Sequence, residues 1–107
     1  MTATLRLTVL VENTVFQPGA LAEHGLSFWL ETPAGSVLFD TGQRYALVAN
    51  VGMLGVRLGE ARAVVLSHGH FDHTGSLEFV LSHAPQATLF AHPAAFAPKF
   101  SLRTPDP

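Results

Sequence analysis

Four side chains in the segment LSHGHFDHTG, residues 66–75, have the types and spacing of a metal-binding cluster: His68, His70, Asp72 and His73. The chain has six histidines in 107 residues, and three of them lie here. Chance would produce the pattern H-x-H-x-D-H in about five of ten thousand chains of this composition, so an accidental polar loop is a poor explanation. Neutral imidazole is the commonest metal ligand, and carboxylate oxygens suit the same borderline cations. The cluster therefore predicts a divalent metal site.

The spacing within the cluster predicts how two ions would be shared. Side chains two positions apart lie on one face of an extended segment, so His68 and His70 are expected to reach one ion, with Gly69 relieving crowding between them. Asp72 and His73 follow a bend and are expected to reach a second ion. Two ions about 3.5–4 Å apart would polarise a substrate oxygen and supply a hydroxide nucleophile. Asp72 is the candidate catalytic residue, because its carboxylate would hold and orient the proton of that nucleophile.

Other polar residues have structural explanations that compete with a functional one. His83 lies at a predicted helix C-terminus, where a protonated imidazole interacts favourably with the last carbonyls. His92 ends a predicted strand, and a structural role or a place at the edge of a substrate site is expected rather than metal ligation. Asp40 follows another strand, where its side chain can cap the next turn.

The residues around the cluster predict a strand before it and a helix after it. ARAVVLS, residues 61–67, is a short continuous apolar run of the kind buried on both faces in α/β proteins. A helix is expected to start at Thr74 or Gly75, run through SLEFVLSH and stop before Pro85. The cluster would then lie at the C-terminal end of a buried strand.

Strands also dominate the first part of the chain. Residues 4–13 alternate, which predicts a half-buried strand with Leu5, Leu7, Val9 and Val11 on one face. Residues 12–25 lack a period and predict a loop. The runs 26–31 and 36–40, joined by the turn sequence Thr-Pro-Ala-Gly, predict a hairpin. Phe28 and Trp29 are adjacent, so one is expected in the core and the other on the opposite sheet face.

The remaining elements complete a layered α/β pattern. A helix is predicted from Arg44 to about Leu54, because apolar residues recur there at helical spacing: Tyr45, Val48, Val51 and Leu54. ATLFAH, residues 87–92, predicts a last strand, Pro93 can open a helical turn through Ala97, and residues 101–107 are expected to be irregular. The order β, β-hairpin, α, β, α, β indicates the α/β class.

Composition excludes several functional classes. Hydrophobic residues make up 48% of the chain and charged residues 13%, which excludes a disordered protein. The net charge of −2 indicates no basic surface for binding nucleic acid. There is no cysteine, so a disulfide scaffold and a thiolate metal site are excluded. The N-terminal sequence fits neither a signal peptide nor a membrane span. A cytoplasmic protein that acts on a small-molecule substrate is expected.

The chain resembles the metallo-β-lactamase superfamily. His68-Gly69-His70-Phe71-Asp72-His73 is similar to its H-x-H-x-D-H signature, and SVLFDTG is similar to the strand that ends in an Asp-containing turn. Four segments together resemble one branch of metal-dependent hydrolases, some described as dihydropterin ribofuranosylaminobenzene phosphate synthases: EHGLSFWLET, LFDTGQ, VVLSHGHFDHTGSL and FAHPAAF. The resemblance extends over nearly the whole chain.

The resemblance implies roles for individual residues. His68 and His70 would bind the first of two divalent ions, taken as zinc with manganese or iron as alternatives. Asp72 and His73 would bind the second, and Asp72 would also contact the bridging water. Asp40 would lie beside the ligands without binding metal. One further histidine, His24, would lie near the mouth of the pocket.

The resemblance also implies that residues 1–107 are a single partial domain. The superfamily fold is an αββα sandwich of two similar halves, and the second half supplies a third histidine for the first ion, a bridging aspartate and a final histidine. This chain is similar to the N-terminal half, a mixed sheet with helices on one face. Half a sandwich would expose its inner apolar sheet face, so self-association is expected.

Three functional hypotheses follow. The first is a metal-dependent hydrolase that attacks an ester, amide or phosphoester bond and is incomplete as this chain. The second is a non-catalytic metal-binding half-domain. The third is an amidohydrolase-type barrel, which also uses H-x-H after a strand. It fits poorly, because such a barrel needs about 250 residues and leaves Asp72 and His73 unexplained.

Overall fold

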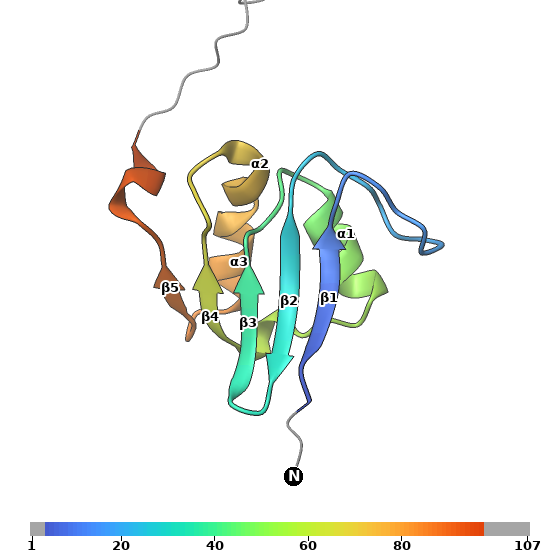
Figure 1. The fold of residues 1–107 in the computed structure, drawn as a ribbon, viewed down its shortest axis with the longest axis horizontal. Helices are drawn as coiled ribbons and strands as arrows, with labels where there is room; N and C mark the ends of the chain where they lie inside the picture. The colour runs from blue at the N-terminus through green and yellow to red at the C-terminus, as the bar shows by residue number, and fades with distance from the viewer. Residues whose placement is uncertain (1–3, 98–107) are drawn as a thin grey trace, which may run out of the picture.

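Five strands form one mixed sheet in the order β1-β2-β3-β4-β5 within residues 4–97, which are the residues that the computed structural model describes (Figure 1). The strands are β1 (Arg6–Val11), β2 (Ser27–Thr32), β3 (Gly35–Phe39), β4 (Ala61–Val65) and β5 (Thr88–Phe90). The pairs β1–β2 and β2–β3 are antiparallel, whereas β3–β4 and β4–β5 are parallel. The mixed sheet and the β2–β3 hairpin are as predicted, and the expected irregular segment 101–107 lies outside the described residues.

The helices lie on one side of this sheet, as predicted (Figure 1). They are α1 (Ala46–Met53), α2 (Phe71–Thr74) and α3 (Leu77–His83), with 3₁₀ turns η1 (Leu58–Glu60) and η2 (Pro93–Phe96). The sequence did not predict α2, because four residues rich in histidine and aspartate carry no helical period. None of the described helices is long and apolar enough to cross a membrane.

The core lies between the helices and one face of the sheet. Trp29, Leu38 and Val64 occupy neighbouring positions on β2, β3 and β4, and each is at most 3% exposed. Leu47 of α1 and Val80 of α3 belong to the same buried cluster. Burying a side chain of this size stabilises the fold by about 1.5–3 kcal/mol, so this face holds the layers together.

The other face of the sheet is apolar but uncovered, and it is called the open face below. Strand register aligns two rows of side chains across it: Leu7-Leu30-Val37-Ala63-Thr88 and Val9-Phe28-Phe39-Val65-Phe90. Leu7 is 56% exposed and Phe90 is 55% exposed. Trp29 and Phe28 therefore lie on opposite faces, as expected.

Burial in β1 and β4 differs in detail from what their sequence patterns indicate, because no described element covers the open face. The alternation in β1 holds through Val9, with Leu5, Leu7 and Val9 on the exposed side. It ends at a register shift between Val9 and Val11, so that Leu10 and Val11 are both buried. Strand β4 was expected to be buried on both faces, and instead only Ala61 and Val64 of its residues are buried. The apolar residues of a strand mark a face that can be covered, whether or not this chain covers it.

Helix α1 forms where predicted, but only part of its predicted apolar set faces the core. Tyr45 is 70% exposed and Val48 is 44% exposed, whereas Ala46, Leu47 and Asn50 are buried. Asn50 decides the orientation: its side-chain amide donates to the carbonyls of Leu10 and Leu21 and accepts from the Leu21 N–H. Val51 and Leu54 of the predicted apolar set do pack against the core, and the buried face also includes Asn50, which an apolar period does not count as a core residue.

Candidate metal centre

The predicted cluster lies where the parallel strands β3, β4 and β5 end. Parallel strands bring their carboxyl ends to one edge of a sheet, which is the usual place for ligand sites in α/β proteins. Asp40 follows β3, Ser67 and His68 follow β4, and His92 follows β5. The Asp40 N–H donates to the Val65 carbonyl at 2.8 Å, which joins the ends of β3 and β4. The sheet thus brings together residues that are far apart in the sequence.

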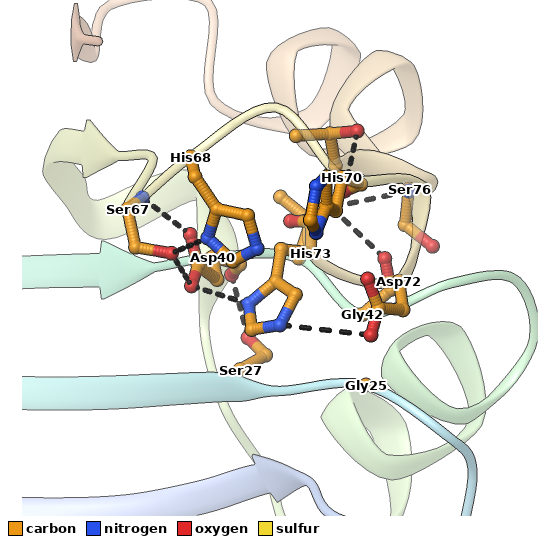
Figure 2. A network of polar contacts seen from close by, with 12 residues as sticks. Gly25, Ser27, Asp40, Gly42, Ser67, His68, His70, Asp72, His73 and Ser76 are labelled. Atoms are coloured by element: carbon orange, nitrogen blue, oxygen red, sulfur yellow. Dashed lines mark hydrogen bonds and ion pairs between the residues drawn. The ribbon is translucent and has the colours of Figure 1, made fainter. Parts of the chain in front are cut away.

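The carboxylate of Asp40 is fully buried and accepts three hydrogen bonds (Figure 2). Its Oδ1 accepts from the Ser67 N–H at 2.7 Å. Its Oδ2 accepts from the Ser67 hydroxyl at 2.6 Å and lies 2.8 Å from His73 Nδ1. Asp40 has a φ of 59°, a left-handed conformation that aspartate tolerates better than most residues. The side chain thus contacts Ser67 and His73 rather than capping the turn that follows it.

Three side chains bring possible ligand atoms together. One ligand atom each from His68, Asp72 and His73 lies within 4.8 Å of the other two, and all three residues are half-buried. The His68 and His73 rings are 4.2 Å apart between centroids, and His73 Nε2 is 3.7 Å from Asp72 Oδ2. His73 Nδ1, the far nitrogen of this ring, faces the Asp40 carboxylate. A carboxylate in that position is the common support for a metal-binding imidazole. Two imidazole nitrogens and one carboxylate oxygen fit zinc, manganese or iron.

His70 lies beside this group without joining it. Its ring centroid is 4.6 Å from that of His68, with the rings edge to face. The residue is exposed and forms the N-cap of α2, where its carbonyl accepts from the N–H groups of His73 and Thr74. The structure therefore gathers three of the four predicted ligands into one set and places the fourth next to it.

His24 reaches the cluster from the loop before β2. Its Nε2 is 3.1 Å from Asp72 Oδ2, and its side chain is 73% exposed whereas that of Asp72 is 22% exposed. Gly25 allows this approach: it has a φ of 142°, and a Cβ there would lie 2.3 Å from the Asp72 carbonyl oxygen. The Leu26 N–H also donates to that carbonyl at 3.3 Å. His24 is thus a direct neighbour of the candidate catalytic carboxylate.

Glu23 anchors the same loop to the start of α1, and the sequence did not indicate this role. Its carboxylate accepts from four successive backbone N–H groups, those of residues 43–46. Burial by itself raises the pKa of Glu23, but these four hydrogen bonds together outweigh it and hold the pKa below the ordinary value of 4.5. The loop that carries His24 is therefore tied to the fold beside the cluster.

His92 and His83 lie where a structural role was expected. His92, with His68 and His70, lines a shallow hollow of about 320 Å³, and its Nδ1 accepts from the Ala94 N–H at 3.0 Å. A neutral His92 therefore carries its proton on Nε2 and offers a donor rather than a metal-binding lone pair. His83 Nδ1 lies 2.9 Å from the Phe79 carbonyl at the end of α3.

Two residues that support the cluster were not predicted. Ser67 bridges Asp40 and His68, since its hydroxyl lies 2.8 Å from His68 Nδ1. The Thr41 hydroxyl donates to the His73 carbonyl at 3.0 Å and accepts from the Ser76 N–H. Neither role has a signal in the sequence, because each depends on a partner supplied by strand pairing or by a distant turn.

Comparison with known proteins agrees with this geometry. The model of the metallo-β-lactamase superfamily matches residues 21–103. The chain is 34% identical over 75% of its length to a 7,8-dihydropterin-6-methyl-4-(β-D-ribofuranosyl)-aminobenzene-5′-phosphate synthase of Methanocaldococcus jannaschii, and 33% identical over 89% to an uncharacterised protein of that organism. It spans only 29% and 37% of the lengths of these two relatives.

Solved structures show the same likeness. The chain is similar to the Rm3 metallo-β-lactamase, with a TM-score of 0.60, 30% identity, and coverage of 83% of this chain and 33% of that one. The fold, the cluster at the end of β4 and the family match all point to one conclusion. The chain belongs to the metallo-β-lactamase superfamily.

Proposed function

We propose that this chain is part of a metal-dependent hydrolase that cleaves an ester, amide or phosphoester bond of a small-molecule substrate. The observation that carries the proposal is the convergence of His68, Asp72 and His73. The buried carboxylate of Asp40 orients His73 by contacting its Nδ1. A divalent ion, for which zinc is our choice, would supply Lewis acidity and lower the pKa of water.

The side chains of the cluster have separable roles in this proposal. His68 and His73 would hold metal through their Nε2 atoms, because their Nδ1 atoms already contact Ser67 and Asp40. His70, beside His68, would add a nitrogen for the ion that His68 binds. Asp72 would bind metal and accept a proton from the attacking water. These assignments keep the two-ion arrangement that the spacing predicts.

The hollow beside the cluster is the proposed entrance for substrate. Its lining includes His68, His70 and His92. The Nε2–H of neutral His92 would donate to a carbonyl or phosphoryl oxygen at the edge of the site. One relative is named a synthase, so bond cleavage in this chain remains the proposed reaction rather than one carried over by name.

Metal binding without turnover is the second candidate function, and the ligand count favours it for the chain alone. Within the described residues, one set of three side chains converges, which is fewer protein ligands than two fixed ions need. A loosely held ion orients water poorly, so the 107-residue chain is expected to hydrolyse generic esters and phosphodiesters barely above background.

Metal content after chelation and reloading with zinc tests the proposal. The wild-type chain should retain zinc through dialysis, and the double variant His68→Ala/His70→Ala should not. His83→Ala is the matched control, since it removes an imidazole outside the cluster and should leave retention unchanged. Equal retention by the wild type and the double variant would overturn the metal site. Zinc-dependent ester hydrolysis that is lost in Asp72→Ala would favour the hydrolase over the non-catalytic function.

A further inference from the structure

Ser67 occupies a position between the buried carboxylate and the first histidine of the cluster (Figure 2). Its hydroxyl oxygen is 2.6 Å from Asp40 Oδ2 and 2.8 Å from His68 Nδ1. Its backbone N–H also donates to the other oxygen of Asp40, so the residue is held at two points. Ser67 can therefore not turn away from the carboxylate without breaking two short hydrogen bonds.

The hydrogen atoms in this network can be assigned by elimination. An ionised carboxylate only accepts hydrogen bonds, so the single hydroxyl proton of Ser67 is donated to Asp40. The hydroxyl oxygen must then accept from His68, which places a proton on His68 Nδ1. The same argument places a proton on His73 Nδ1, which faces the same Asp40 oxygen at 2.8 Å. Both imidazoles then keep the lone pair of Nε2.

We infer that Ser67 is a positioning residue of the metal centre, which sets the tautomer of His68 so that its Nε2 is free to bind metal. One carboxylate thus orients two imidazoles: Asp40 acts on His73 directly and on His68 through the Ser67 hydroxyl. The inference rests on the proposed metal-binding function, but the tautomer it assigns is a property of the metal-free chain.

The assignment has consequences because it opposes the intrinsic preference of histidine. A free neutral histidine side chain favours the Nε2–H tautomer, in which the nitrogen needed here carries the proton. In a metal-binding histidine the tautomer and ring orientation are set by the hydrogen bond of the other nitrogen, and losing such support typically lowers metal affinity by about 10- to 100-fold. By holding His68 in the Nδ1–H tautomer, Ser67 would prevent this loss of metal affinity.

The chain contains a matched control in the pair Ser82 and His83. Here too a serine hydroxyl lies next to the Nδ1 of the following histidine, at 3.1 Å. However, His83 Nδ1 also faces the Phe79 carbonyl at 2.9 Å, and a carbonyl only accepts. The proton on His83 Nδ1 is therefore directed by the backbone, and the Ser82 hydroxyl is not needed for it.

Nitrogen-15 NMR of the metal-free chain, at an alkaline pH where imidazoles are neutral, reads each tautomer directly. His68 should be the Nδ1–H form in the wild type and in Ser67→Thr, which keeps the hydroxyl, and should change mainly to the Nε2–H form in Ser67→Ala. Ser82→Ala should leave His83 in the Nδ1–H form. Ser67 is exposed, so its removal should not unfold the chain, and circular dichroism checks this.

Zinc titration of the same variants completes the test. Ser67→Ala should bind zinc about 10- to 100-fold more weakly than the wild type, and Ser67→Thr and Ser82→Ala should bind like the wild type. An Nε2–H tautomer of His68 in the wild type, or an unchanged tautomer in Ser67→Ala, would overturn the inference. If the tautomer responds as expected but the wild type binds no zinc, the proposed function fails and the role of Ser67 in setting the tautomer stands.

Discussion

The tetrapeptide Val-Leu-Ser-His occurs twice in this chain, at residues 65–68 and 80–83, and the two copies have different structures and surroundings. The first copy ends β4 and leads into the candidate metal cluster. The second copy ends α3, where the Ser82 hydroxyl donates to the Phe79 carbonyl at 2.8 Å and His83 faces the same carbonyl. Identical residues therefore contribute to a candidate site in one place and satisfy a helix end in the other.

The difference lies in where each copy finds its hydrogen-bond partner. His83 uses a carbonyl four residues earlier in its own helix, which any helix end provides. Ser67 uses Asp40, which is 27 residues away in the sequence and adjacent only because β3 and β4 pair in parallel. The comparison teaches that the chemistry of a Ser-His pair depends on the long-range neighbour it receives.

The valines of the two copies should respond most differently to substitution. Val80 is fully buried, so Val80→Lys should place an unpaired charge in the core and lower the free energy of unfolding by about 4 kcal/mol or more. Val65 lies in a row of the open face, so Val65→Lys should cost less than about 1 kcal/mol. Urea denaturation measures both values, and equal losses would contradict the contrast between the two copies.

The same Val65→Lys variant bears on self-association, which we propose occurs between the open faces of two copies. The two rows across that face carry no charged residue, and a lysine in one of them should weaken the contact. Sedimentation of the wild type should show concentration-dependent association that the variant reduces. A monomeric wild type at high concentration would reject this mode of association.

Asp40 should be the most sensitive residue outside the core, because it is the partner that the second copy lacks. Asp40→Asn keeps the size of the side chain and its tolerance of a left-handed backbone. It loses the charged carboxylate that accepts hydrogen bonds from Ser67 and His73. We expect a loss of about 2–4 kcal/mol in the free energy of unfolding, with a large loss of zinc affinity. Ser82→Ala, which removes a hydroxyl from the second copy, should stay within about 0.5 kcal/mol.

Substitutions of His68 and His83, the histidines of the two copies, should have very different effects on zinc affinity. His68→Ala removes a proposed ligand and should weaken zinc binding by at least about 100-fold, beyond what loss of a supporting residue typically costs. His83→Ala should leave the affinity unchanged, because its imidazole lies at the end of α3. Titration calorimetry with zinc gives both constants, and comparable losses in the two variants would mean that the copies are not functionally distinct.

The smallest effect is expected at Glu23, which ties the loop of His24 to the start of α1. Its pKa in the folded chain is below the ordinary value of 4.5, so its charge stabilises the fold fully above that value. The contribution should fade as the pH drops from the ordinary pKa through the lowered one.

Glu23→Gln should therefore lose about 1 kcal/mol of stability at neutral pH, a typical value for a helix cap, and nothing in acid below the lowered pKa. The exposed Glu12→Gln carries the same charge change and is the control. Urea midpoints across the pH range check this. A deficit of Glu23→Gln that grows toward acid pH would show that the sign of the argument is wrong.

The sequence by itself determined the elements whose cause is local. The hairpin, the strand and helix around the cluster, the helix before η1 and the capped end at His83 all follow from alternation, helical period or turn residues that act over a few positions. The candidate metal motif is also local, because His68, His70, Asp72 and His73 lie within one short segment, and the superfamily model matches residues 21–103 around it.

Tertiary structure decided which faces are covered and which partners meet. The apolar side of β1 is exposed because the helices lie against the opposite face, and α1 turns Asn50 inward because backbone groups of two other segments need its amide. Parallel pairing of β3 with β4 brings Asp40 to Ser67 and His73. Local patterns report what a segment can form, whereas the register between distant strands decides which Ser-His pair receives a carboxylate.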